Sequence, residues 1–303
     1  MKKNTWALGL KITVSFVSTL SVLLSIVSPT FSANAQAKEA VLESGPAPLP
    51  PEYKLDFSEY DPPLGTYTYT VGWEGIPAAE ATISVARDEG NYRVVATAKT
   101  YSGIDIFYRL RYRAEGLLTG SEMLPIKTTI DQEENSKVKN SEITFHDDGR
   151  IEAVRETKGK PIQVVDFTPE SYTLDPFSAA FIARGVDWKV GDTKTFSAFN
   201  GKTRYKIVLS AVGTDTIEVN GVDREVWDIM PKVYDLTDDK LTKKLREAHI
   251  FVTTDSKREI LKISSSVFIG SVTTELDSFE PLPDASKGLQ VAQNGAHRPK
   301  SSL

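Results

Sequence analysis

The sequence predicts an all-β protein in which a large curved antiparallel sheet forms a barrel, half-barrel or sandwich, with one short helix inserted near residues 175–184. Between residues 65 and 281, apolar residues recur with a period of two, which is typical of strands with one buried face. These segments are short and are separated by turn-forming residues. About fourteen such strands are expected, and strongly twisted sheets rarely stay open beyond ~10 strands.

The first 37 residues are interpreted as a secretory signal peptide. Lys2, Lys3 and Lys11 precede the apolar stretch 12–27, and the small residues within 33–37 offer a cleavage site. The alternative is an uncleaved membrane anchor. Against it, six of the sixteen residues in 12–27 are Ser or Thr, whereas a spanning helix needs ~20 predominantly apolar residues. We therefore expect a periplasmic protein with no transmembrane segment after cleavage.

Charge and cysteine content exclude several classes of protein. After removal of residues 1–37 the chain carries 33 basic and 41 acidic residues, a formal charge of −8 over 266 residues. An acidic exported chain does not favour nucleic-acid binding. Because the sequence has no Cys, it cannot form a disulfide framework, a thiolate nucleophile, a Cys-ligated metal site or a lipobox lipid anchor.

Two segments flank the predicted β-rich domain of residues 65–281. Residues 38–64 contain six prolines, four of them in 46–51, which favours an extended linker. The alternative, a partner-binding proline motif, lacks the flanking pattern that such motifs require. Residues 282–303 are rich in Ser, Gly, Gln and Asn without apolar periodicity, so a disordered tail is expected.

The strands are expected in the following order. In 65–73, Tyr67, Tyr69, Val71 and Trp73 share one face, and threonines occupy the other. Residues 79–85 alternate similarly, and the turn at 88–91 leads into 92–99, which predicts a hairpin. The remaining strands are expected at 107–114, 126–132, 142–146, 151–157, 162–167, 193–199, 204–212, 216–220, 224–230, 248–253, 260–267 and 271–279, with turns at 147–149, 200–201, 220–221 and 254–256. The charged segment 235–247 is interpreted as a hairpin loop or a short surface helix.

One segment departs from the strand pattern and predicts the helix. Asp175 is an acidic N-cap, Pro176 occupies the first helical position and Gly185 follows the end. The spacing i, i+4 and i+7 places Phe177, Phe181 and Arg184 on one face.

This helix allows two interpretations. If it closes the mouth of a curved sheet or lines a groove, Phe177, Phe181 and Arg184 are candidate ligand-binding residues. In the other interpretation Asp175 only caps the helix, the two phenylalanines fill the core, and Arg184 pairs with a carboxylate near the helix end.

Three arginines form a second candidate site. Arg109, Arg111 and Arg113 alternate with apolar residues along one strand, so their guanidinium groups lie on one face. If that face looks into the mouth of a barrel, the three residues could bind an anionic head group through bidentate contacts. The alternative is a solvated face paired with Glu on neighbouring strands.

No catalytic residue, metal site or cofactor is predicted. The three histidines, His146, His249 and His297, form neither an HExxH nor an HxH motif, and GxSxG, GxxxxGK[ST] and GxGxxG are absent. The Asp-Asp-Gly at 147–149 lacks the remaining ligands of a calcium loop. Glycosidase chemistry with paired carboxylates stays an alternative, because the separation of two acids is a property of the fold.

Three blocks of the sequence form a recognisable pattern: 65–67 with 73–80, the helix 175–184, and 199–205, with a weaker closing pair at 251–255 and 270–272. Through these blocks, roughly residues 64–281 resemble a bacterial family of exported proteins defined only as a domain of unknown function, DUF3108. Ala79 stands where a second small residue such as Gly is expected, and Asn200 where Asp is common. The resemblance implies an exported β-rich domain and no established activity.

The favoured function is a non-catalytic binder or carrier of a hydrophobic or lipid-like envelope molecule. A curved sheet with one apolar face and a helix at one end would form a concave apolar site. Such a carrier needs a cavity of roughly 300–1,000 Å³. The alternatives are a scaffolding protein that binds an envelope protein through an exposed apolar patch, and a carboxylate-dependent envelope hydrolase with a cleft of acids whose pKa values differ.

Overall fold

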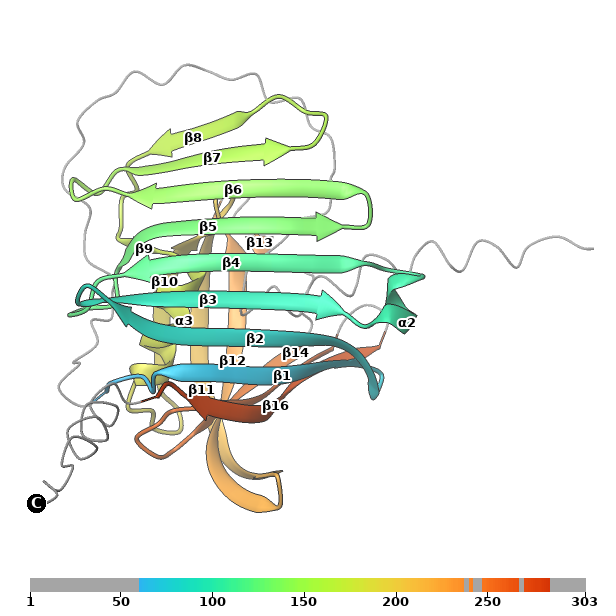
Figure 1. Cartoon of the computed structure of the whole chain (residues 1–303). Coiled ribbons are helices and arrows are strands. Elements are labelled where there is room, and N and C mark those ends of the chain that lie inside the picture. Colours follow the sequence, from blue (N-terminus) through green and yellow to red (C-terminus); the bar gives the residue numbers. More distant parts are fainter. Residues whose placement is uncertain (1–59, 237–239, 242–246, 267–269, 284–303) are drawn as a thin grey trace, which may run out of the picture.

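The computed structural model describes residues 60–236, 240–241, 247–266 and 270–283 (Figure 1). Within these ranges the chain forms sixteen strands in one continuous sheet and two helices. The predicted signal peptide lies outside the described residues, as do most of the predicted linker and tail. Among the described helices, none has the length and apolar character needed to cross a membrane.

The helices are α2 (Ser102–Asp105) and α3 (Pro176–Gly185). The strands are β1 (Gly65–Trp73), β2 (Ile76–Asp88), β3 (Asn91–Thr100), β4 (Leu110–Leu118), β5 (Pro125–Glu134), β6 (Lys137–Phe145), β7 (Ile151–Thr157), β8 (Gln163–Phe167), β9 (Thr173–Leu174), β10 (Thr193–Phe199), β11 (Arg204–Val219), β12 (Val222–Asp235), β13 (Lys240–Leu241), β14 (Glu247–Thr253), β15 (Ile260–Ser266) and β16 (Ser271–Pro281).

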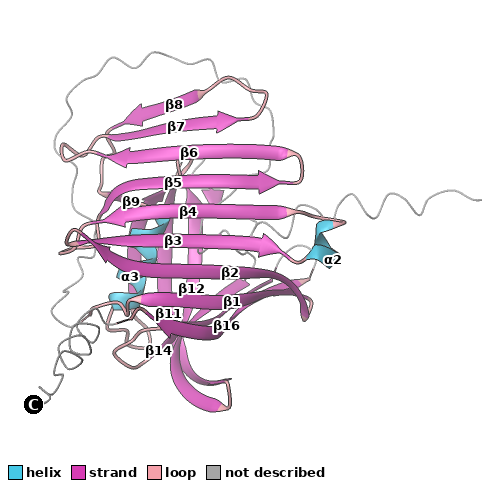
Figure 2. Ribbon diagram, viewed as in Figure 1, coloured by secondary structure: helices cyan, strands magenta, loops and turns pink. Residues whose placement is uncertain are grey.

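The sheet curls into two layers with α3 between them. Its strand order is β8-β7-β6-β5-β4-β3-β2-β1-β16-β15-β14-β12-β11-β10-β9, with β13 added beside β12. All neighbours are antiparallel except β9 and β10. Figures 1 and 2 show β1–β8 stacked as a first layer, with β10–β12 crossing steeply behind it. We call β9–β12 with β14 and β15 the second layer. The predicted fold class, a curved antiparallel sheet with one inserted helix, is confirmed.

Two apolar clusters meet at α3. The first contains inward-facing residues of β1–β5 together with Phe177 and Phe181 of the helix. The second contains residues of β10–β12, β14 and β15 together with Ala179 and Ile182. A short helix surrounded by apolar surface on both sides buries its residues against both layers, which fixes its place inside the sheet.

The two free ends of the sheet approach each other through side chains. No backbone ladder joins β8 to β9 in the described ranges. Instead, Ile143, Ile151 and Ala153 of β6 and β7 pack with Phe199 of β10. The ring of Phe167 on β8 meets Phe199 edge to face, with centroids 5.1 Å apart. The structure is therefore a curled, hydrogen-bonded sheet closed on one side by an apolar contact.

Turn chemistry fixes the hairpins as predicted. Glu89 and Gly90 between β2 and β3 have φ of 49° and 87°, and Asn220 and Gly221 between β11 and β12 have φ of 54° and 77°. Two successive left-handed residues form the tight turn that suits the twist of an antiparallel pair.

Some element boundaries differ from the prediction. Residues 204–219 form one strand rather than two, because a bulge at Ala211 and Gly213 lets the ladder with β12 continue. Residues 107–109 are not a strand; they follow the unpredicted helix α2. The segment 235–247 lies partly outside the described residues, and its described part includes β13, which pairs with β12.

Candidate ligand-binding pocket

The start of α3 is fixed by its N-cap, as predicted. Asp175 has extended backbone angles, and its Oδ1 accepts a hydrogen bond from the Ser178 backbone N–H at 2.7 Å. Pro176 follows at the first position, where a missing N–H costs no hydrogen bond. The other carboxylate oxygen, Oδ2, accepts the hydroxyl of Thr128 on β5 at 2.5 Å. The cap therefore also ties the helix to the first layer.

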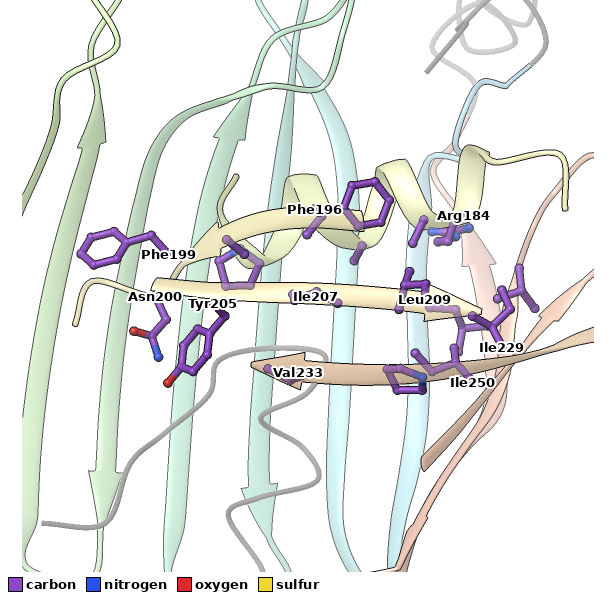
Figure 3. A pocket seen from close by; sticks show the side chains of 18 residues that line it. Arg184, Phe196, Phe199, Asn200, Tyr205, Ile207, Leu209, Ile229, Val233 and Ile250 are labelled. Carbon is purple, nitrogen blue, oxygen red and sulfur yellow. The ribbon is translucent and has the colours of Figure 1, made fainter. Parts of the chain in front are cut away.

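A pocket lies between α3 and the second layer (Figure 3). Its empty volume is about 860 Å³, which includes the part open to solvent. The lining residues are Pro176, Ala179, Ala180, Ala183 and Arg184 of α3, Phe196, Ala198 and Phe199 of β10, the following Asn200, Tyr205, Ile207 and Leu209 of β11, Ile229, Pro231 and Val233 of β12, Ile250 and Val252 of β14, and Ile260 of β15. Arg184, Asn200 and Tyr205 supply the polar side chains, and the rest of this lining is apolar.

Strand periodicity explains the lining. Tyr205, Ile207 and Leu209 are alternate residues of β11, so their side chains point to the same face, and the same holds for the three residues of β12. On the helix side, three alanines leave space where larger side chains would fill it. Pro231 falls between Ile229, where the ladder of β12 with β14 ends, and Tyr234, where its ladder with β13 begins. Pro231 pairs with Leu209 of β11 on one side, and its other side lies in this gap, where a residue without an N–H is tolerated.

Arg184 is the charged residue of the lining and is buried, with 7% of its surface exposed. Its Nε donates to the carbonyl oxygen of Arg258 at 2.7 Å, and its Nη2 donates to the carbonyl oxygen of Lys257 at 3.2 Å and to the hydroxyl of Tyr67 at 3.4 Å. Within the described part of the chain, no Asp or Glu forms an ion pair with it. The interpretation that Arg184 pairs with a carboxylate near the helix end is therefore wrong, because backbone carbonyls occupy that position.

Three buried tyrosines, Tyr60, Tyr67 and Tyr69, influence the pKa of this guanidinium group. Burial raises the pKa of Tyr60 to about 12 and raises the pKa values of Tyr67 and Tyr69 as well. All three phenols are consequently neutral near pH 7. Burial alone lowers the pKa of Arg184, but the same tyrosines raise it and the net shift is upward. The end of the pocket therefore holds a cation among neutral partners.

Phe177 and Phe181 do not line this pocket. Both belong to the apolar cluster of the first layer, and Phe181 stacks near Tyr92 with centroids 6.5 Å apart. The interpretation that the two phenylalanines fill the core is therefore confirmed. Of the helix residues predicted to bind ligand, Arg184 lines the pocket, whereas the two aromatic rings position the helix from its opposite side.

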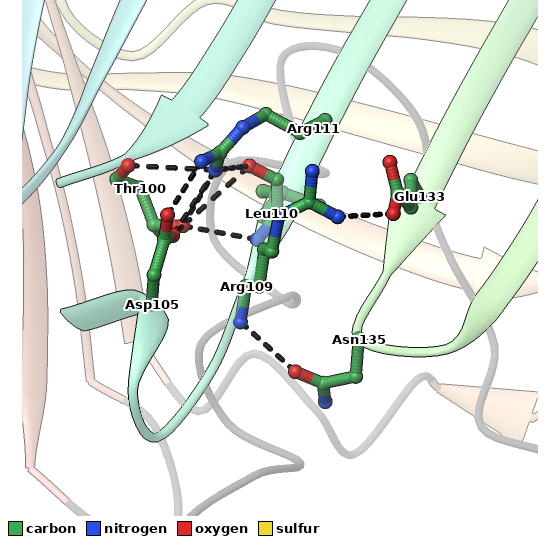
Figure 4. Close-up of polar contacts among 7 residues, drawn as sticks. All are labelled: Thr100, Asp105, Arg109, Leu110, Arg111, Glu133 and Asn135. Atoms are coloured by element: carbon green, nitrogen blue, oxygen red, sulfur yellow. Dashed lines mark hydrogen bonds and ion pairs between the residues drawn. The ribbon is translucent and has the colours of Figure 1, made fainter. Parts of the chain in front are cut away.

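Arg109, Arg111 and Arg113 lie in β4 or directly before it, and Figure 4 shows the contacts of Arg109 and Arg111. Leu110 and Tyr112 point into the core, so Arg111 and Arg113 point the other way. Arg109 pairs with Glu133 of β5, Arg111 with Asp105 of α2, and Arg113 Nη2 with Glu115 Oε2 at 3.0 Å. Their face does not look into the sheet, so the condition for binding a head group there is not met.

The described lining of the pocket contains no carboxylate and no histidine. His249 instead pairs with Asp228 between β14 and β12, Nδ1 to Oδ1 at 2.7 Å. In the described ranges, no group of three or more His, Cys, Asp or Glu side chains is arranged to hold a metal ion.

Comparison with known proteins agrees with this fold. The solved beta-barrel-like protein of domain of unknown function DUF1849 from Brucella abortus aligns over 73% of this chain and 97% of its own, with 8% identity and a TM-score of 0.51. The hypothetical lipoprotein YmcC from Escherichia coli and the lipoprotein LppX from Mycobacterium tuberculosis each align over 73% of this chain, covering 92% and 89% of their own. Their TM-scores are 0.27 and 0.22, with 8% and 12% identity.

Sequence comparison gives the family. No curated protein matches the chain. The family described as protein of unknown function (DUF3108) matches residues 68–277, more than half of the chain, in agreement with the residue blocks noted above. The chain therefore belongs to the DUF3108 family.

Proposed function

We propose that this protein is an exported, non-catalytic carrier of a hydrophobic molecule, whose apolar part lies in the pocket between α3 and the second layer. The observation that carries the proposal is the pocket itself, which is lined mainly by Ala, Ile, Leu, Val and Phe side chains. Its empty volume of about 860 Å³ includes space that is open to solvent, so a bound molecule would be enclosed only in part.

The helix supports this proposal because it leaves the pocket unfilled. Protein interiors are normally packed to the density of organic crystals, so an apolar space of this kind is a loss of packing energy unless something occupies it. Ala180 and Ala183 face the pocket and are only partly buried, although α3 lies inside the sheet. A hydrophobic ligand would cover these alanines and complete the packing.

Native mass spectrometry of the mature protein, purified from the periplasm without detergent and followed by organic extraction, tests the proposal. We expect a stoichiometric hydrophobic adduct on the wild type. We expect Ala183→Phe to remove the adduct, since a phenyl ring fills the space, while the melting temperature stays the same or rises.

The matched control is Ala86→Phe. Ala86 lies on β2 beside the inward-facing Val85, so the same change is made on the outer face. This variant should retain the adduct. A bare mass for the wild type, under conditions that preserve the ligand of a known carrier, would overturn the proposed function.

A further inference from the structure

We infer that the carried molecule is an amphiphile with an anionic oxygen head group, a carboxylate or a phosphate, which pairs with Arg184 while its chain extends along β11. The inference rests on the proposed function and names the chemical class of the ligand.

The hydrogen bonds of Arg184 leave one side of its guanidinium group unused. Its bonds to Arg258, Lys257 and Tyr67 employ Nε and Nη2. No hydrogen bond or ion pair within the described ranges employs Nη1. The guanidinium group also lies over the rings of Tyr67 and Phe181, 5.4 and 5.7 Å from their centroids. Nη1 carries two N–H groups, which can donate charge-assisted hydrogen bonds to the oxygens of a carboxylate or phosphate. In the proposed complex, Nη1 makes this contact with a ligand in the pocket that Arg184 lines.

The charge of Arg184 is also uncompensated. Buried charges in proteins are normally paired, because removing an ion from water is unfavourable. Glu259, which follows Arg258 in the chain, is buried but is engaged by Arg224, with Nη2 and Oε2 2.9 Å apart. An anion in the pocket would supply the missing counter-charge.

The pocket has the shape for the rest of such a molecule. Figure 3 shows Arg184 toward one end and Phe199, Asn200 and Tyr205 toward the other, with Ile207 and Leu209 between them. Tyr205 to Leu209 spans about 13 Å along β11 at ~3.3 Å per residue. An apolar chain that starts at Arg184 can follow these side chains.

Three ligands of equal chain length test the inference: decanoate, decyl phosphate and decanol, titrated by calorimetry into delipidated mature protein. We expect the wild type to bind at least one anion on the order of tenfold more tightly than decanol, because only the anions pair with the guanidinium group. The tighter of the two anions distinguishes a free fatty acid from a phosphate-bearing lipid as the source of the head group.

Arg184→Met should bind decanol as the wild type does and should lose the preference for anions. Arg111→Met makes the same change on the outer face, and this variant should retain the preference for anions. If Arg184 serves only to hold the turn before β15, its replacement will instead weaken all three ligands equally. If Arg184→Met does not fold, Arg184→Lys, which keeps the charge, is expected to retain part of the preference.

The outcomes separate the two proposals. Equal affinity of the wild type for decanol and both anions would overturn the head-group assignment and leave the carrier function standing. Failure of all three ligands to bind would overturn both.

Discussion

Replacement of Gly116 by valine is expected to lower the free energy of unfolding by about 1–3 kcal/mol, because it forces a side chain into a packed contact. Gly116 lies on β4, and a Cβ atom at this position would lie 2.5 Å from Cδ2 of Phe177, well inside the ~3.5–4.0 Å of an optimal carbon contact. The helix approaches the first layer closely here. Denaturant unfolding of the two proteins, wild type and variant, measures the effect.

The partner of this contact gives a sharper test. Phe177→Ala alone should lower the free energy of unfolding by about 3–5 kcal/mol, since the ring is buried in the core. In the double variant the valine occupies part of the vacated space, so the total effect should be smaller than the sum of the single effects. Gly213→Val is the control, because a Cβ there meets nothing within 4 Å. Simple additivity would contradict the contact.

Local patterns were sufficient to predict most strands. Strands β1, β7 and β10 have the predicted bounds, because their alternation is bounded by residues that favour turns. The helix α2 was not predicted, since four residues carry too little periodicity. It is held by a tertiary contact, in which Asp105 Oδ1 accepts a hydrogen bond from Arg111 Nη1 at 3.0 Å. The continuation of β11 beyond residue 212 was not predicted either. It depends on a bulge, and a bulge is defined by the pairing with β12, which the sequence of β11 alone does not show.

The candidate site could be predicted only in part. The sequence identified the helix and the face that carries Phe177 and Phe181, but spacing does not reveal which layer each face meets. The inner wall of the first layer is rich in small residues, among them Ala96 and Ala114, and it accepts the two rings. The alanines of the helix are then left facing the second layer, where the pocket forms. Alternation likewise placed Arg111 and Arg113 on one face without showing that this face is the outer one.

The cap of the inserted helix is the second position where one residue has a large effect. Asp175 is fully buried, and its carboxylate accepts hydrogen bonds from Ser178 and Thr128. Asp175→Ala removes a cap worth ~1 kcal/mol and leaves the buried Thr128 hydroxyl without its acceptor, at ~1–3 kcal/mol. We therefore expect the free energy of unfolding to fall by about 2–4 kcal/mol in denaturant unfolding. If Asp175→Ala lowers the free energy of unfolding by less than Thr128→Val does, this role of Asp175 is contradicted.

Asp175→Asn separates hydrogen bonding from charge. Asparagine keeps an oxygen that can accept the Ser178 N–H, so this variant should be closer to the wild type than Asp175→Ala. Burial raises the pKa of Asp175 above its unfolded value of about 3.9. The folded state of the wild type therefore binds this proton more tightly, and the resulting stabilisation is fully present below the unfolded pKa and is lost as pH rises through the folded pKa. Because asparagine does not ionise, the stability of Asp175→Asn relative to the wild type should increase from pH 4 to pH 8. The opposite trend would show that the pKa of this carboxyl group is lowered in the folded protein, so that its hydrogen bonds outweigh burial.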